Sequence, residues 1–198
     1  MRTVAALFDD YEDARRTVHD LEAAGYPSDD ISIVVNNAGD RYSGAGAAAG
    51  AGAGLGAVSG GAAGLLAGLG LMAIPGVGPV VAAGWLVSTA TGAAAGAVVG
   101  GAVGGIIGSL TDAGIAEEDA HLYAEGIRRG GALVTVRVDD SRAAQADGIM
   151  RNRNAVDISV RRRAYVEQGW TEFDSASPPF SLDDVVRERE SHGRTTSP

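Results

Sequence analysis

The sequence predicts an α+β protein, a ferredoxin-like sandwich of two βαβ halves that is interrupted between its second and third strands. Three observations support this: a βαβ pattern in the first forty residues, a helix–strand–helix–strand pattern after residue 115, and an uncharged Gly- and Ala-rich run between them. The expected arrangement is a four-stranded sheet with its helices on one face. The predicted parts are a first half over 1–40, an insertion over 41–115, a second half over 116–163 and an irregular tail over 164–198.

The first half alternates between strand and helix patterns. Residues 3–8 form a short apolar run with Val and Phe, as in a strand. Asp9 and Asp10 are N-cap candidates for a helix over 11–24, whose apolar residues recur at helical spacing. Residues 31–35 are β-branched and short, which is typical of a strand. The predicted order is therefore β, α, β.

The second half repeats this alternation after the insertion. A helix is expected over 116–129, because three carboxylates occupy its first turn and two arginines its last, as the helix dipole favours. Residues 132–138 have the strongest strand pattern of the chain, and a helix is expected over 141–153. Residues 156–160 alternate between apolar and polar, which indicates a half-buried strand.

The tail has no regular periodicity and is rich in Ser, Thr, Pro and mixed charge. One short helix is expected near 182–190, and the last residues are expected to be poorly ordered. Trp170 and Phe173 are interpreted as packing residues that fasten the tail rather than as a ligand cage.

Within the insertion, the run over residues 42–111 carries no charged side chain and repeats Gly at every fourth position in two tracts. On a helix, each tract would form a smooth ridge that lets another helix approach closely. Between the tracts, two prolines and two glycines predict a helix stop and a reversal. The insertion is therefore predicted to be an apolar helical hairpin with turn residues Pro75, Gly76, Gly78 and Pro79 and helix-packing residues Gly52, Gly56, Gly60, Gly64, Gly68, Gly92, Gly96, Gly100, Gly104 and Gly108.

Two partners fit such a hairpin. Each leg would be about 45 Å long at 1.5 Å per residue, enough to cross a hydrocarbon core of ~30 Å. Hydrophobicity is weak, however, because the larger apolar residues concentrate in 65–87 and 98–110. The partner is thus a lipid bilayer or other copies of the chain. If a membrane is involved, Arg41 and the pair Arg128 and Arg129 favour a cytoplasmic position for the α/β body; the alternative location is the cytoplasm itself.

Composition excludes several other functions. A net charge of -9 and a pI near 4.7 argue against a nucleic-acid partner. The chain has no Lys and no Cys, so Walker lysines, Schiff-base lysines, thiolate metal ligands and cysteine nucleophiles are absent. His19, His121 and His192 are too far apart for a metal-binding spacing. No catalytic residue, cofactor, metal or small-molecule substrate is predicted.

Several short motifs follow one another in a distinctive order: Phe8-Asp9-Asp10, Leu21–Tyr26, Asp30–Val34, the Gly/Ala run around Ile74–Pro79, and Tyr123–Gly131. In this order they resemble bacterial general stress proteins with a YflT-like domain, over roughly Thr3 to Val138. The resemblance implies a stress-associated, non-enzymatic protein and supplies no catalytic residues. The expected function is therefore a general-stress-type protein that inserts into or associates with a membrane and self-associates. A soluble homo-oligomeric assembly module is the first alternative, and a ferredoxin-like small-ligand sensor is the second.

Overall fold

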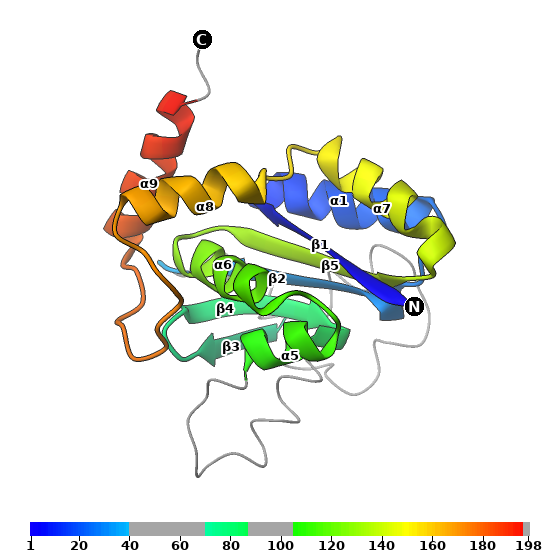
Figure 1. The fold of residues 1–198 in the computed structure, drawn as a ribbon, viewed down its shortest axis with the longest axis horizontal. Helices are drawn as coiled ribbons and strands as arrows, with labels where there is room; N and C mark the ends of the chain where they lie inside the picture. The colour runs from blue at the N-terminus through cyan, green and yellow to red at the C-terminus, as the bar shows by residue number, and fades with distance from the viewer. Residues whose placement is uncertain (40–69, 87–104, 196–198) are drawn as a thin grey trace.

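The computed structural model describes residues 1–39, 70–86 and 105–195. Within these ranges, five strands form one antiparallel sheet (Figure 1). The strand order across the sheet is β1 (Arg2–Phe8), β5 (Ala132–Val138), β2 (Ile31–Asn36), β4 (Gly78–Gly84) and β3 (Gly70–Ile74). The coarse prediction of an α+β protein is confirmed.

The centre of the sheet is a split βαβ unit. Strands β1 and β2 each pair antiparallel with β5, so they run parallel to each other with β5 between them. Helix α1 (Tyr11–Ala23) connects β1 to β2, and the Asp10 side chain caps it by accepting a 2.7 Å hydrogen bond from the Glu12 amide. A short 3₁₀ turn, η1 (Ser28–Asp30), precedes β2. Strands β1, β2 and β5 and helix α1 lie where the sequence predicts them, whereas η1 was not predicted.

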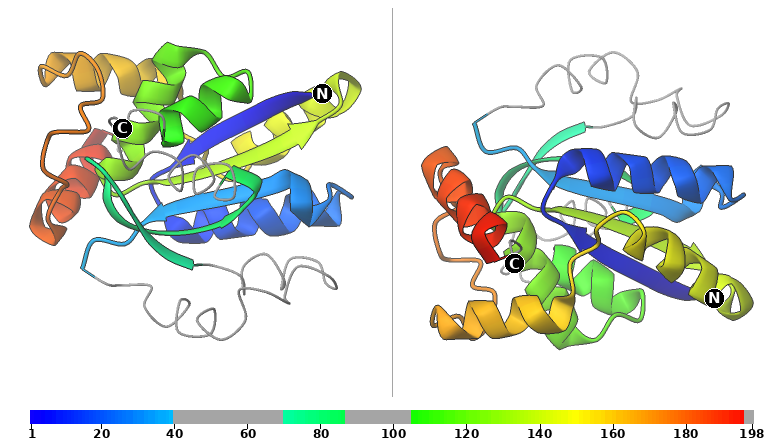
Figure 2. Two further views of the ribbon diagram at one scale, coloured as in Figure 1. Left: turned by 90° about the horizontal axis from the view of Figure 1, so that it is seen from below. Right: turned by 90° about the horizontal axis from the view of Figure 1, so that it is seen from above.

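Helices cover both faces of the sheet, which corrects the expectation of helices on one face (Figure 2). Helices α1 and α7 (Ala143–Arg151) pack on one face, and α5 (Ile106–Asp112) and α6 (Glu117–Arg128) pack on the other. Adjacent residues of β1 enter opposite cores: Phe8 faces α1, Leu7 faces α6, and both are fully buried. Consecutive strand residues point to opposite faces, so a strand this apolar needs cover on both.

The prediction of a helical hairpin is wrong for its described central part. The chain does reverse at residues 75–77, but it does so between the antiparallel strands β3 and β4. Gly76 and Gly78 have φ of +74° and +97°, values that suit glycine. Val80 packs into the core beside α6 and Val81 into the core beside α1, so β4 buries side chains on both faces. Pairing with β2 also satisfies the backbone groups of β4 without a helix.

Most of the predicted helix-packing glycines lie outside the described residues: Gly52, Gly56, Gly60, Gly64, Gly68, Gly92, Gly96, Gly100 and Gly104. Gly108 lies in α5, and a Cβ added there would meet no described atom within 4 Å. Its predicted packing role therefore has no contact to support it in the described part of the chain. Within the described ranges, no helix combines the length and the apolar character needed to cross a membrane.

The predicted strand over 156–160 is also wrong. Val156 donates one 2.8 Å hydrogen bond to the Leu7 carbonyl at the edge of β1, and helix α8 (Ile158–Glu167) then begins. Asp157 causes the change, because its carboxylate accepts hydrogen bonds from the Ser159 and Val160 amides and so caps the helix. The alternation of polar and apolar residues here reflects a capping sequence and not a strand.

The remaining elements complete the second half. The 3₁₀ turn η4 (Asp140–Arg142) leads from β5 into α7, close to the predicted helix over 141–153. The tail contains a longer helix than expected, α9 (Leu182–Thr195). The expectation about the order of the last residues concerns 196–198, which lie outside the described part. The tail leads past the C-terminal end of α6, where a group of largely buried charges lies.

Candidate functional site

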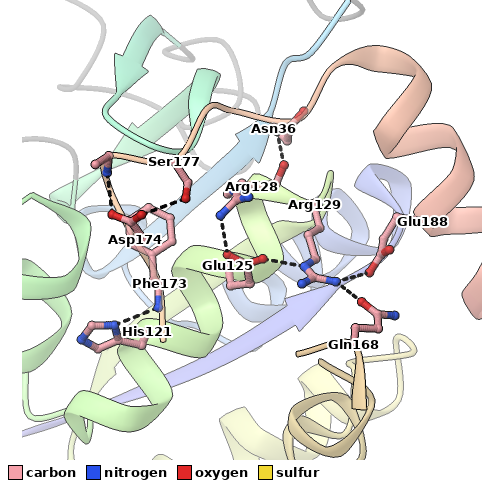
Figure 3. Close-up of polar contacts among 11 residues, drawn as sticks. Asn36, His121, Glu125, Arg128, Arg129, Gln168, Phe173, Asp174, Ser177 and Glu188 are labelled. Atoms are coloured by element: carbon pink, nitrogen blue, oxygen red, sulfur yellow. Dashed lines mark hydrogen bonds and ion pairs between the residues drawn. The ribbon is translucent and has the colours of Figure 1, made fainter. Parts of the chain in front are cut away.

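Four charged residues meet at the C-terminal end of α6, and we call Glu125, Arg128, Arg129 and Glu188 the Arg129 hub (Figure 3). Glu125 is buried, with 1% of its surface exposed. Its two carboxylate oxygens accept hydrogen bonds from Arg128 Nη1 at 3.3 Å and from Arg129 Nε at 2.6 Å. Burial of a carboxylate is costly unless it is paired, and here two guanidinium groups pair it.

Arg129 links helices α6, α8 and α9. Its Nη1 donates to Glu188 Oε1 at 2.9 Å and also to Gln168, and its guanidinium lies 4.0 Å from the centre of the Tyr165 ring. Burial by itself would lower the pKa of Arg129, but hydrogen bonds and attraction from Glu125 and Glu188 outweigh it and raise that pKa. Arg129 is therefore charged at neutral pH.

Residues 168–189, which we call the C-terminal strap, lie against the hub and the β3–β4 turn. The Phe173 amide donates to His121 Nδ1 at 3.2 Å, and the Phe173 side chain is 8% exposed. Asp174 then folds the strap back on itself by accepting hydrogen bonds from the Ala176 amide and the Ser177 hydroxyl, both at 2.8 Å. The strap is thus an ordered part of the fold.

Three glycines allow the strap to approach closely. A Cβ at Gly76 would lie 2.6 Å from the Cα of Ser175, and one at Gly78 would lie 2.7 Å from Pro179 Cβ. A Cβ at Gly130 would lie 2.3 Å from Val185 Cγ1. Each distance is too short for a real side chain, so these positions require glycine for contact as well as for their positive φ. The β3–β4 turn and the end of α6 are therefore shaped to receive the strap.

A second buried cation holds α8 in place. Arg161 Nη2 donates to Asp9 Oδ2 at 2.6 Å and so ties α8 to the loop after β1. Burial raises the pKa of Tyr165 to about 12, so its hydroxyl stays protonated beside Arg161 and Arg129 at neutral pH.

The hub suits a structural role rather than catalysis or ligand binding. Its two carboxylates and two guanidiniums balance in charge, and they are directed at one another rather than at an open cavity. In the ranges that the structure covers, no group of three or more His, Cys, Asp or Glu side chains is placed to hold a metal ion. The geometry is that of a lock between α6 and the strap.

The structure places several sequence-predicted residues in contacts that the sequence did not predict. Pro75, Gly76, Gly78 and Pro79 lie at the strand reversal that touches the strap. Arg128 and Arg129, predicted to mark a cytoplasmic side, are engaged by Glu125 in an ion-pair network. Arg41, the third residue of that prediction, lies outside the described residues.

Sequence reasoning missed Glu125, Gln168 and Glu188 as partners of these arginines. The available signal was the set of aromatic residues in the tail. Phe173 is buried, and the Trp170 ring packs edge-on against Tyr165 with centroids 5.9 Å apart, which confirms the interpretation of both as packing residues.

The N-terminal part of the chain is similar to a known protein family. Residues 3–75 match the heat induced stress protein YflT domain. The YflT match confirms the resemblance stated from the sequence motifs, and it suggests a general stress function. It begins in β1 and ends at Pro75, the first residue of the β3–β4 turn, so the Arg129 hub and the strap lie beyond it. No curated protein and no solved structure matches the chain.

Proposed function

We propose that this chain is a non-enzymatic general-stress protein that acts as a self-associating structural module. The YflT match supports the stress-related part of this proposal. The charged groups of the Arg129 hub satisfy one another, which favours a structural role over catalysis. Of the two interaction modes considered from the sequence, membrane insertion and self-association, we propose self-association, because the described structure buries apolar residues on which membrane insertion depended.

The preference for self-association over membrane insertion rests on where the larger apolar residues of the uncharged run lie. Val80 and Val81 are buried in the two cores of the sheet, and Ile106, Ile107 and Leu110 are buried between α5 and the sheet. These residues supplied much of the hydrophobicity on which membrane insertion depended. Among the described residues, no strand pairs with the outer edge of β1, and an unpaired strand edge is a template for pairing with another chain.

Detergent dependence of solubility and size tests the proposal. The untagged protein would be released by lysis without detergent, separated from membranes by ultracentrifugation, and measured by sedimentation velocity over a range of concentrations. We expect it in the supernatant as a species larger than the 19.9 kDa monomer, with the same size in the presence of mild detergent. Recovery only from the membrane pellet with detergent would support the bilayer prediction instead. A monomer at all concentrations would contradict self-association.

A further inference from the structure

The edge of β1 presents unused backbone hydrogen-bonding groups. The Leu7 carbonyl accepts from the Val156 amide and the Ala5 carbonyl accepts from the Tyr123 hydroxyl, so Ala5 and Leu7 direct their backbone groups away from β5. In an antiparallel pair this direction alternates along the strand, so Thr3 also points outward. The amides of Thr3 and Ala5 and the carbonyl of Thr3 have no partner among the described residues.

The N-terminal half of β1, residues 2–5, is exposed enough for another strand to reach its edge. Arg2 is exposed and Thr3, Val4 and Ala5 are half-exposed, whereas β1 is buried from Ala6 onward. Two shallow cavities, of about 330 and 460 Å³, flank this stretch and share Arg2 and Thr3 in their linings. Val156 occupies the edge beside Leu7, so an added strand would lie along residues 2–5.

The larger of the two cavities lies between β1 and α7 and has a balanced set of charges. Its lining includes two guanidinium groups and two carboxylates, those of Arg2, Arg151, Asp140 and Asp147. The lining of this cavity is therefore a neutral strip, although the whole chain has a net charge of -9. A strongly charged partner would find no complement here, whereas a second copy would bring an equally neutral strip that holds both signs.

We propose that two copies of this chain pair through β1, antiparallel and about a two-fold axis at Val4. In this register Thr3 lies opposite Ala5 of the second copy, and both are residues whose backbone groups point outward. The pairing would join two five-stranded sheets into one and satisfy the unused groups of both edges. This inference rests on the proposed self-association and names the surface responsible for it.

Proline at position 3 provides the first test. Thr3→Pro removes an amide that points away from β5, a position that an edge strand tolerates, and leaves the β1–β5 hydrogen bonds in place. Thr3→Val is the matched control, since it keeps the amide and the branched side chain. Sedimentation velocity should show at least a tenfold weaker self-association for Thr3→Pro and an unchanged one for Thr3→Val. Circular dichroism establishes that both variants remain folded.

Disulfide trapping provides a second test that does not depend on proline being tolerated. The natural chain has no cysteine, so an introduced one is unique. Residues opposite each other at a non-hydrogen-bonded antiparallel position have Cα atoms about 4.5 Å apart, within the range that a disulfide spans. Val4→Cys should form a covalent dimer under mild oxidation at micromolar concentration. Val166→Cys, on the exposed face of α8, should form far less.

The two experiments separate the failure of this inference from the failure of the proposed function. If the natural protein self-associates but Thr3→Pro has no effect and Val4→Cys forms no more dimer than Val166→Cys, then β1 pairing is wrong and self-association occurs elsewhere. If the natural protein is monomeric and Val4→Cys forms no excess dimer, both are wrong. Loss of assembly in folded Thr3→Pro, together with selective Val4→Cys trapping, establishes the β1 interface.

Discussion

Glu125 lies at a position where a buried carboxylate is not expected. It lies in the last turn of α6, where the helix dipole disfavours a carboxylate, and its side chain is 1% exposed. Both effects would destabilise the folded protein if the charge were alone. Arg128 and Arg129 follow it in the sequence and fold back over it, so the same turn that disfavours the anion supplies the cations that balance it.

Glu125→Gln should lower the free energy of unfolding by about 3 kcal/mol, because it leaves two largely buried guanidinium groups short of one negative charge. Urea denaturation followed by circular dichroism measures the change. Glu188→Gln is the control: Arg129 loses one partner but keeps Glu125, so a loss of about 1 kcal/mol is expected. Equal losses for the two variants would show that Glu125 has no central role.

At the scale of elements, local signals predicted most of the first half and of the strand–helix pair β5–α7. Asp10 was sufficient to predict the start of α1, and the β-branched run over 31–35 was sufficient to predict β2, because capping and strand propensity are both local properties. The β3–β4 hairpin was missed because the hydrophobic residues of this Gly- and Ala-rich run have no strong period. The four-residue glycine spacing was then the only periodic signal, and it favoured a helix. Residues 78–84 form a strand because they pair with β2, and pairing with a distant segment is not a local property.

The hub and the strap could not be predicted for a similar reason. The residues that meet at Arg129 come from three helices, and Glu188 is separated from it by 59 positions. No spacing rule connects them. The arginine pair was visible in the sequence, but its partners depend on how α8 and α9 return to α6. The aromatic residues of the tail indicated only that the tail packs somewhere.

The start of α9 has a reciprocal cap that makes its stability depend on pH. The Ser181 hydroxyl and amide both donate to Asp184 Oδ2, at 2.6 and 3.0 Å, and with Arg187 they lower the pKa of Asp184 to about 2. A carboxyl whose pKa is lower in the folded state than its ordinary value of 3.8 stabilises the fold at pH values above 3.8. This contribution is lost as the pH falls from 3.8 towards 2.

Ser181→Ala should therefore raise the pKa of Asp184 towards its ordinary value, because it removes the hydroxyl that contributes most to the shift. Carboxyl NMR titration of the full chain measures it. Ser177→Ala is a matched control, since the Ser177 hydroxyl donates to Asp174 instead and should leave Asp184 unchanged. A pKa of Asp184 that stays near 2 without the Ser181 hydroxyl would rule out this cap as the cause.

At the scale of the whole molecule, the strap connects regions far apart in the sequence. It touches the β3–β4 turn through Ser175 and Pro179, and the end of α6 through Val185. The YflT match ends at the turn that the strap covers, so the C-terminal part of the chain completes the packing around the matched part. We expect the strap and the sheet to unfold together, because their contacts are buried and mutual.

Neighbouring valines of α9 test this cooperativity. Val185 is fully buried against Gly130 and Val186 is 43% exposed, so Val185→Ala should cost about 2 kcal/mol and Val186→Ala less than about 0.5 kcal/mol. The two tryptophans report on different parts of the molecule: Trp170 lies in the strap, and Trp85 follows β4 and packs in the core beside α6.

In backgrounds that keep one tryptophan each, Trp85→Phe or Trp170→Phe, the urea midpoint of the remaining indole would be followed by fluorescence. Val185→Ala should lower both midpoints by the same amount, because a cooperative unit loses stability as a whole wherever the cavity is made. If only the Trp170 midpoint moved, the strap would unfold separately from the sheet. The Arg129 hub would then fasten an appended segment rather than hold the fold together.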